Sequence, residues 1–198
     1  MSDIRDLFKR RDMDTKSDLN MTATPAAGPV IPPAVVWLTG LSGAGKTTIG
    51  RALYADLSAR GVRVEFLDGD AVRDLLPGTG FTRAERDAHV KRVGFLASRL
   101  EHHDILVICA LISPYREARE YSRRLCRRFV EVHVATPLEE CERRDPKALY
   151  ARARRGEIQN FTGVSDPYEA PLAPDVVIDT RGVSVEDAVG QILSVLGV

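Results

Sequence analysis

Apolar runs alternate with helical stretches along most of the chain. Val35 to Leu38 is a continuous apolar run, the stretch from Lys46 to Arg60 carries apolar or small residues at helical spacing, and Val62 to Leu67 is rich in β-forming residues. The pattern therefore predicts strand, helix and strand in that order. Later apolar runs predict further strands at 105–110, 129–134 and 176–178.

Capping residues mark where the later helices begin. Thr82, with Glu85 three residues on, predicts a capping box at the start of a long helix. Thr136 is expected to cap the next helix, with a proline in the first helical position. Ser184 is expected to cap a closing helix whose apolar residues keep helical spacing.

Strands that are apolar along their whole length are buried on both faces, and helices lie between them in the chain. The sequence therefore predicts an α/β fold over residues 34–198, with a parallel sheet between two layers of helices (three-layer αβα). The stretch from Asp145 to Pro174 is rich in charge, Gly and Pro, and we interpret it as a lid insertion. Residues 1–33 combine dense charge with a Thr/Ala/Pro/Gly stretch and are expected to form a flexible N-terminal extension.

Charge and cysteine content exclude several classes of protein. The 28 Lys and Arg residues cancel the 28 Asp and Glu residues, so the basic excess that favours nucleic acid or an anionic membrane surface is missing. No apolar run approaches the ~18 residues that span a bilayer. The 3 cysteines are far apart and suit a reducing compartment. We therefore expect a cytoplasmic protein with no nucleic-acid or membrane partner.

A glycine-rich segment follows the first apolar run and precedes the first helix. It matches the P-loop pattern G-x-x-x-x-G-K-[ST] in the strand–helix context that the motif requires. Lys46 is expected to reach the β and γ phosphates of ATP, and the Thr47 hydroxyl to bind Mg²⁺. A regulatory GTPase is disfavoured, because neither Asn20 nor Asn160 precedes a lysine. The predicted ATP-binding residues are Gly40, Leu41, Ser42, Gly43, Ala44, Gly45, Lys46, Thr47 and Thr48.

Polar residues also follow the second and third predicted strands. Asp68 and Asp70 end the second strand, and Arg73 lies one helical turn beyond them. Ligands of open α/β sheets bind beyond the carboxyl ends of the strands, so we expect these side chains to form an acceptor site beside the P-loop. The neighbouring segments add Phe81, Arg86, His89, Ile112 and Ser113.

Together with the segments 141–147, 156–163 and 166–169, these motifs resemble the adenylyl-sulfate kinase (APS kinase) family over about residues 34–198. The resemblance implies transfer of the ATP γ-phosphate to the 3′-hydroxyl of adenosine 5′-phosphosulfate in sulfate activation. The products would be 3′-phosphoadenosine 5′-phosphosulfate and ADP, with Mg²⁺ as cofactor. The resemblance also implies a homodimer and leaves a sulfurylase partner open.

The resemblance further implies roles for individual residues. Arg73, Arg86 and Lys147 would hold the phosphosulfate, which suits guanidinium and ammonium groups. Phe81 and Phe161 would clamp the adenine of the acceptor between their rings. The implied substrate-binding set is Asp70, Arg73, Phe81, Arg86, His89, Ile112, Ser113, Lys147, Asn160 and Phe161.

The catalytic set is Lys46, Asp68, Asp70 and Ser113. Either Asp68 or Asp70 would orient the acceptor hydroxyl and take its proton, and the sequence leaves both open. Ser113 occupies the place of a possible phosphoserine in the family, although direct in-line transfer needs no such intermediate.

Three positions depart from the family pattern. His89 stands where asparagine is expected, Ala71 replaces a residue that is often asparagine, and the loop at 75–80 is short. We expect His89 to point at the acceptor pocket, so that its protonation near pH ~6.5 influences acceptor binding.

Phe161 lies in a polar insert, where a core position is not expected, and this favours a ligand contact. The histidines and arginines outside these motifs receive an ordinary structural interpretation. His102 and His103 are expected at the surface. A solvated helix face is expected for the basic cluster Arg119, Arg123, Arg124, Arg127 and Arg128.

Two alternatives remain open. One is another small P-loop kinase that phosphorylates a nucleoside monophosphate or a polyol acid and lacks the paired phenylalanine clamp. The other is a non-catalytic nucleotide-binding subunit of a sulfate-activating complex. The presence of Lys46, Thr47, Asp68 and Asp70 argues against a site without activity.

Overall fold

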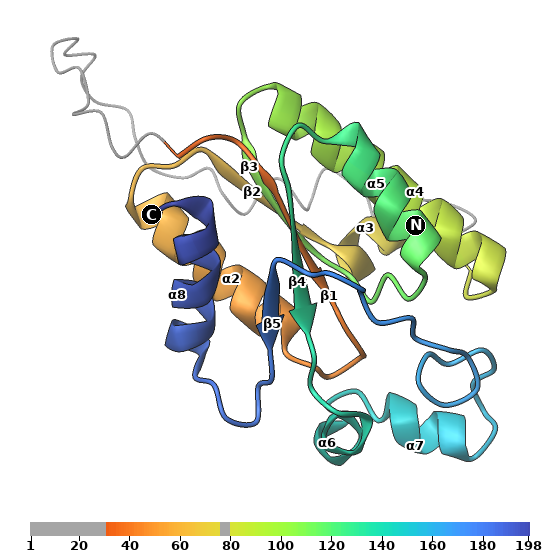
Figure 1. The fold of residues 1–198 in the computed structure, drawn as a ribbon. Helices are drawn as coiled ribbons and strands as arrows, with labels where there is room; N and C mark the ends of the chain where they lie inside the picture. Colours follow the sequence, from red (N-terminus) through yellow and green to blue (C-terminus); the bar gives the residue numbers. More distant parts are fainter. Residues whose placement is uncertain (1–30, 76–79) are drawn as a thin grey trace, which may run out of the picture.

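The described residues, 31–75 and 80–198 of a computed structural model, form one parallel sheet flanked by helices (Figure 1). The sheet has 5 strands in the order β2-β3-β1-β4-β5, and every neighbouring pair is parallel. The strands are β1 (Val35–Thr39), β2 (Val64–Asp68), β3 (Leu106–Ala110), β4 (Phe129–Val134) and β5 (Val176–Ile178). The helices are α2 (Lys46–Ala59), α3 (Gly69–Leu75), α4 (Arg83–His102), α5 (Arg116–Leu125), α6 (Leu138–Arg144), α7 (Leu149–Arg154) and α8 (Val185–Leu196).

The two faces of the sheet bury two separate apolar cores. Because strand side chains alternate between faces, Val36 and Leu38 of β1 join the core that includes residues of α2 and α8. Val35 and Trp37 join the core on the opposite face, with residues of α4 and α5. Figure 1 shows these two helix pairs on either side of the strands. The predicted three-layer αβα fold is confirmed.

Two of the three predicted helix caps are confirmed. Thr82 and Glu85 form the capping box at the start of α4, and the Ser184 hydroxyl accepts a hydrogen bond from a backbone N–H in the first turn of α8. The predicted Thr136 cap is wrong, because α6 begins later and has no side-chain cap. The Thr136 hydroxyl instead donates to Ala44 O of the P-loop at 2.9 Å, so this threonine ties the β4–α6 connection to the phosphate-binding segment.

The insert at 145–174 is more ordered and more buried than its composition suggests. It contains α7, whose first turn is held by Asp145: the carboxylate accepts from the backbone N–H of Tyr150 and Ala151. Tyr150 and Phe161 are 2% and 8% exposed and belong to the same core as α2 and α8. The expectation that Phe161 lies outside the core is therefore wrong. The interpretation of residues 145–174 as a lid stays a prediction.

Two other regions bear on the sequence predictions. Of the predicted N-terminal extension at 1–33, residues 1–30 lie outside the described part of the chain, as do residues 76–79 of the short loop. Among the helices of the described residues, none is both long enough and apolar enough to cross a membrane.

Candidate active site

The segment between β1 and α2 folds as a tight phosphate-binding turn. Gly40, Gly43 and Gly45 have φ values of 152°, 74° and 105°, in a region that side chains disfavour. A Cβ atom at Gly40 would lie 2.4 Å from Val134 O, so only glycine fits beside β4. Gly45 is the N-cap of α2. The turn therefore brings backbone N–H groups and the positive end of a helix to the carboxyl end of the sheet.

Lys46 is held inside this turn. Its side chain is 9% exposed, and Nζ donates to Gly40 O at 2.9 Å and to Leu41 O at 2.7 Å. Burial lowers the pKa of Lys46 to about 8, against the raising effect of Cys141, Asp70 and Asp68. An anionic phosphate beside Nζ would favour the charged form, so nucleotide binding and protonation of Lys46 support each other.

A pair of carboxylates at the end of β2 faces the P-loop. The Thr47 hydroxyl donates to Asp68 Oδ2 at 3.1 Å, and Asp68 Oδ1 accepts from the Asp70 N–H at 3.0 Å. Asp70 Oδ2 accepts from Lys147 Nζ at 2.6 Å, and both side chains are exposed. The structure thus brings together four of the predicted site residues, from three separate parts of the sequence.

The oxygen donors here fit Mg²⁺. This ion is held in phosphotransferases by one or two protein oxygens, water and the substrate phosphates, and not by a full protein cage. The Thr47 hydroxyl and the Asp68 carboxylate are such a pair. No cluster of three or more His, Cys, Asp or Glu side chains suited to a metal occurs among residues 31–75 and 80–198.

His89 contacts the backbone of the turn that carries the two aspartates. It is 1% exposed on α4, and its Nε2 lies 3.1 Å from the carbonyl oxygen of Gly69, the residue between Asp68 and Asp70. A carbonyl only accepts, so Nε2 carries the proton, and the buried Nδ1 has no partner among the described residues. Burial, followed by the charge of Arg73, lowers the pKa of His89 to about 4. The expected titration near ~6.5 is therefore wrong.

Two arginines hold the edge of the acceptor region around Phe81. Arg86 Nε donates to Phe81 O at 2.8 Å and Nη2 to Asn160 O at 2.6 Å, so it links α4 to the insert. Arg73 Nη1 donates to Gly80 O at 2.7 Å. Both guanidinium groups lie over the Phe81 ring, at 4.8 and 5.5 Å from its centroid. The ring itself is 56% exposed and open to a ligand.

Phe161 and Phe81 have different environments. Phe161 packs edge-on against Tyr150 with the ring centroids 5.0 Å apart, and the Tyr150 hydroxyl donates to Ser42 O of the P-loop at 2.9 Å. Phe161 therefore helps to join the insert to the phosphate site. Sequence reasoning missed Tyr150, since its signal was only an aromatic residue in a charged helix.

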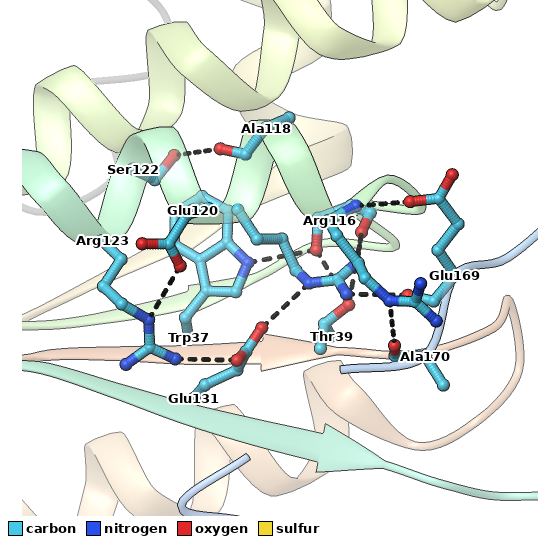
Figure 2. A network of polar contacts seen from close by, with 12 residues as sticks. Trp37, Thr39, Arg116, Ala118, Glu120, Ser122, Arg123, Glu131, Glu169 and Ala170 are labelled. Carbon is cyan, nitrogen blue, oxygen red and sulfur yellow. Dashed lines mark hydrogen bonds and ion pairs between the residues drawn. The ribbon is translucent and has the colours of Figure 1, made fainter. Parts of the chain in front are cut away.

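Ser113 is part of a buried polar network at the ends of β1 and β3, whose members Trp37 and Thr39 are labelled in Figure 2. It is 2% exposed and adopts a left-handed φ of 40°, which costs a non-glycine residue about 1–2 kcal/mol. Its hydroxyl donates to Thr39 Oγ1 at 2.9 Å and accepts from Trp37 Nε1 at 3.1 Å. Thr39 Oγ1 also donates to Ile112 O at 2.8 Å. The structure therefore presents Ser113 as a fixed backbone position, with its hydroxyl turned into the protein.

The predicted solvated face of basic residues is only partly correct. Arg124 and Arg127 are exposed, but Arg119 is 3% exposed and forms an ion pair with Glu131 of β4 at 2.9 Å. His103 is exposed and His102 half-buried. Arg119 therefore belongs to the interior of the site region.

The fold and the site together define a P-loop phosphotransferase with an acceptor region beside its nucleotide site. The family model for adenylylsulphate kinase matches residues 32–179, and the chain belongs to this family. A relative from Deinococcus deserti named adenylyl-sulfate kinase is 50% identical over 179 residues, covering 90% of this chain and 99% of the relative. One from Halothermothrix orenii with the same name is 49% identical over 162 residues, covering 81% and 88%.

Solved structures give the same assignment. The Mycobacterium tuberculosis APS kinase, solved with AMPPNP and APS, matches with a TM-score of 0.81 at 36% identity, covering 84% of this chain and 99% of that one. A hexameric APS kinase from Thiobacillus denitrificans matches with a TM-score of 0.64 at 39% identity, covering 83% of this chain but 29% of that one. A gluconokinase from Sinorhizobium meliloti, at 18% identity and a TM-score of 0.52, shares the fold alone.

Proposed function

We propose that this chain transfers the γ-phosphate of ATP to the 3′-hydroxyl of adenosine 5′-phosphosulfate. The observation that carries the proposal is the convergence of a complete P-loop, the Asp68–Asp70 turn and the Arg73–Phe81–Arg86 cluster on one edge of the sheet. Membership of the adenylyl-sulfate kinase family supports the identity of the acceptor. The products are ADP and 3′-phosphoadenosine 5′-phosphosulfate.

The nucleotide side of the reaction uses the P-loop. Backbone N–H groups of residues 40–48 bind the phosphates, and Lys46 neutralises charge on the transferring group. Thr47 and Asp68 would hold Mg²⁺ on the protein side, and the bound ion would supply further neutralisation of the phosphate charge. Because phosphoryl transfer asks mainly for positioning and electrostatic stabilisation, these groups account for most of the chemistry.

The two aspartates divide the remaining roles. Asp68 accepts hydrogen bonds from the Thr47 hydroxyl and the Asp70 N–H. These contacts direct its carboxylate towards Thr47, where Mg²⁺ would bind. Asp70 is 73% exposed at the side chain and paired with Lys147. Asp70 therefore orients the acceptor hydroxyl and receives its proton, and Lys147 holds that carboxylate in place.

The acceptor side is built from α3, α4 and the insert. Arg73, Arg86 and Lys147 supply positive charge for the phosphosulfate, and the exposed ring of Phe81 offers a stacking surface for the adenine. Phe161 closes the opposite side from within the core. The carbonyl oxygens of Ile112, Ser113 and Asn160 accept hydrogen bonds that support this pocket, and the His89 side chain contacts Gly69 O.

The wider setting follows from the family. The reaction is a step of sulfate activation, and we infer that the protein acts in the cytoplasm as a homodimer, with a sulfurylase as the source of its acceptor. The nucleoside monophosphate or polyol acid kinase and the non-catalytic subunit receive no support from the comparisons.

A panel of acceptors tests the proposal. Purified protein with ATP and Mg²⁺ is incubated with adenosine 5′-phosphosulfate, AMP, gluconate or shikimate, and ADP release is followed. Turnover is expected to be far faster with adenosine 5′-phosphosulfate, because the basic trio and the phenylalanine ring fit its two ends. Equal or faster turnover with another acceptor would show the assignment to be wrong.

A further inference from the structure

One buried arginine joins two segments that border the acceptor region. Arg119 of α5 is 3% exposed, and its guanidinium donates to β4 and to both of these segments. Nη1 donates to Ser113 O in the β3–α5 loop at 2.6 Å, and Nη2 donates to Glu169 O, in the C-terminal part of the insert, at 2.7 Å. Nε donates to Glu131 Oε1 of β4 at 2.9 Å. The three acceptors come from three separate parts of the chain.

These contacts require the shape of an arginine. A planar guanidinium presents donors in fixed, divergent directions, whereas a lysine ammonium is a single compact point of charge. Glu131 neutralises the buried charge of Arg119, and its second oxygen accepts from Arg123 Nη2 at 2.8 Å. Arg123 is 32% exposed at the side chain, and it reaches neither Ser113 O nor Glu169 O.

The segments joined by Arg119 are fastened to each other at further points. The Glu169 N–H donates to Pro114 O at 2.8 Å, and the Glu169 carboxylate accepts from the Arg116 N–H at 2.9 Å. The Tyr115 hydroxyl donates to the Asp166 carboxylate. Arg119 thus lies at the centre of a seam between the β3–α5 loop and the C-terminal end of the insert.

The seam continues into the acceptor region on both sides. On one side, Ser113 keeps its left-handed backbone while Arg119 holds its carbonyl, and Ile112 precedes it. On the other side, the Asp166 N–H donates to Phe161 O at 3.1 Å, which connects the fastened end of the insert to the proposed clamp. The β3–α5 loop and the insert thus form two walls of the acceptor pocket. A shift of the seam would move these two walls relative to each other.

We propose that Arg119 is a positioning residue for the kinase reaction, which sets the spacing between the two walls of the acceptor pocket through Ser113 O and Glu169 O. The proposal rests on the proposed function. Arg119 acts on acceptor binding and orientation, and not on the P-loop, whose contacts with Lys46 lie elsewhere.

Two matched substitutions test this role. Arg119→Lys keeps the positive charge beside Glu131 but cannot reach both carbonyls, and Arg123→Lys makes the same change at the second partner of Glu131. Arg119→Lys is expected to raise the KM for adenosine 5′-phosphosulfate about tenfold or more, since small misplacements of bound groups are costly. The KM of Arg119→Lys for ATP is expected to stay within about twofold of the value for the unaltered enzyme. In Arg123→Lys, the KM values for both ATP and the acceptor are expected to stay within the same range.

Several results would overturn the proposal. An acceptor KM in Arg119→Lys equal to that of the unaltered enzyme is one, and an equal rise in the KM for ATP is another, since it would indicate general loss of structure. If Arg119→Lys does not fold, Glu131→Gln replaces it, because loss of the carboxylate that holds Arg119 Nε leaves the guanidinium less firmly fixed at both carbonyls. Glu131→Gln is expected to raise the acceptor KM alone, and unchanged constants would contradict the role.

Hydrogen exchange separates this proposal from the proposed function. The backbone N–H groups of Arg116 and Glu169, which bond across the seam, are expected to exchange faster in Arg119→Lys than in Arg123→Lys. Equal exchange would show that Arg119 does not fasten the seam. If the unaltered enzyme fails to phosphorylate adenosine 5′-phosphosulfate, the proposed function is wrong, whereas this comparison still tests the contact.

Discussion

Replacement of His89 by asparagine should change how the stability of the protein depends on pH. His89 is 1% exposed, so burial favours its neutral form in the folded protein, although its hydrogen bond to Gly69 O acts in the opposite direction. Burial lowers its pKa from 6.5 to about 4. The unfolded chain therefore binds a proton at His89 at a higher pH than the folded chain does.

The sign and size of the effect follow from this difference. Above the unfolded value of 6.5 both states are neutral at His89, and the residue adds no pH dependence. As the pH falls below that value, protonation favours the unfolded chain, by about 1.4 kcal/mol per pH unit. The contribution reaches about 2 kcal/mol near pH ~5 and levels off at about 3 kcal/mol once the pH passes below the folded value.

Urea unfolding at several pH values measures this effect. The difference in unfolding free energy between the unaltered protein and His89→Asn is expected to shift by about 2 kcal/mol between pH ~7 and pH ~5, with the unaltered protein losing more. His103→Asn is the control, because it changes an exposed histidine directly after α4, the helix that carries His89. This variant should follow the unaltered protein. A difference that stays constant across this range would refute the buried neutral state of His89.

Three further predictions concern the site. Lys46→Ala should lower kcat by ~10²-fold or more and leave far-UV circular dichroism unchanged, because Lys46 acts on phosphates at a turn; near-normal turnover would contradict that role. Phe161→Ala should cost about 3–5 kcal/mol of unfolding free energy, since the ring is packed in the core. Phe81→Ala should instead raise the acceptor KM with little loss of stability. The reverse pattern would contradict the core position of Phe161 and the ligand contact of Phe81. Hydrogen exchange in residues 145–174 should slow when both substrates bind, and identical exchange with and without them would make the insert a static element.

The fold could be predicted from the sequence because its signals are local. A strand buried on both faces, such as β3, is a continuous apolar run, and the P-loop glycines are required by backbone geometry wherever this turn occurs. The capping box at Thr82 needs only residues within one turn of helix. These features do not depend on distant partners, so the sequence alone contains them.

The errors arose where a distant partner decides the environment. Arg119 has the composition of a solvated helix face, but Glu131 on β4 neutralises it, which permits burial. Phe161 lies among polar residues in sequence, yet Tyr150 offers it an apolar neighbour. Thr136 has a partner in Ala44 O that lies 92 residues away along the chain. Such pairings appear only once the sheet is assembled.

The chemical identity of the product tests the central claim most directly. Protein, Mg²⁺, ATP and adenosine 5′-phosphosulfate are incubated together, and the nucleotide products are separated and examined by phosphorus and proton nuclear magnetic resonance. We predict one new phosphate, on the 3′-hydroxyl of a nucleotide whose phosphosulfate is intact, in amounts equal to the ADP formed. A phosphate on any other position, or ADP released together with inorganic phosphate and unchanged acceptor, would contradict it.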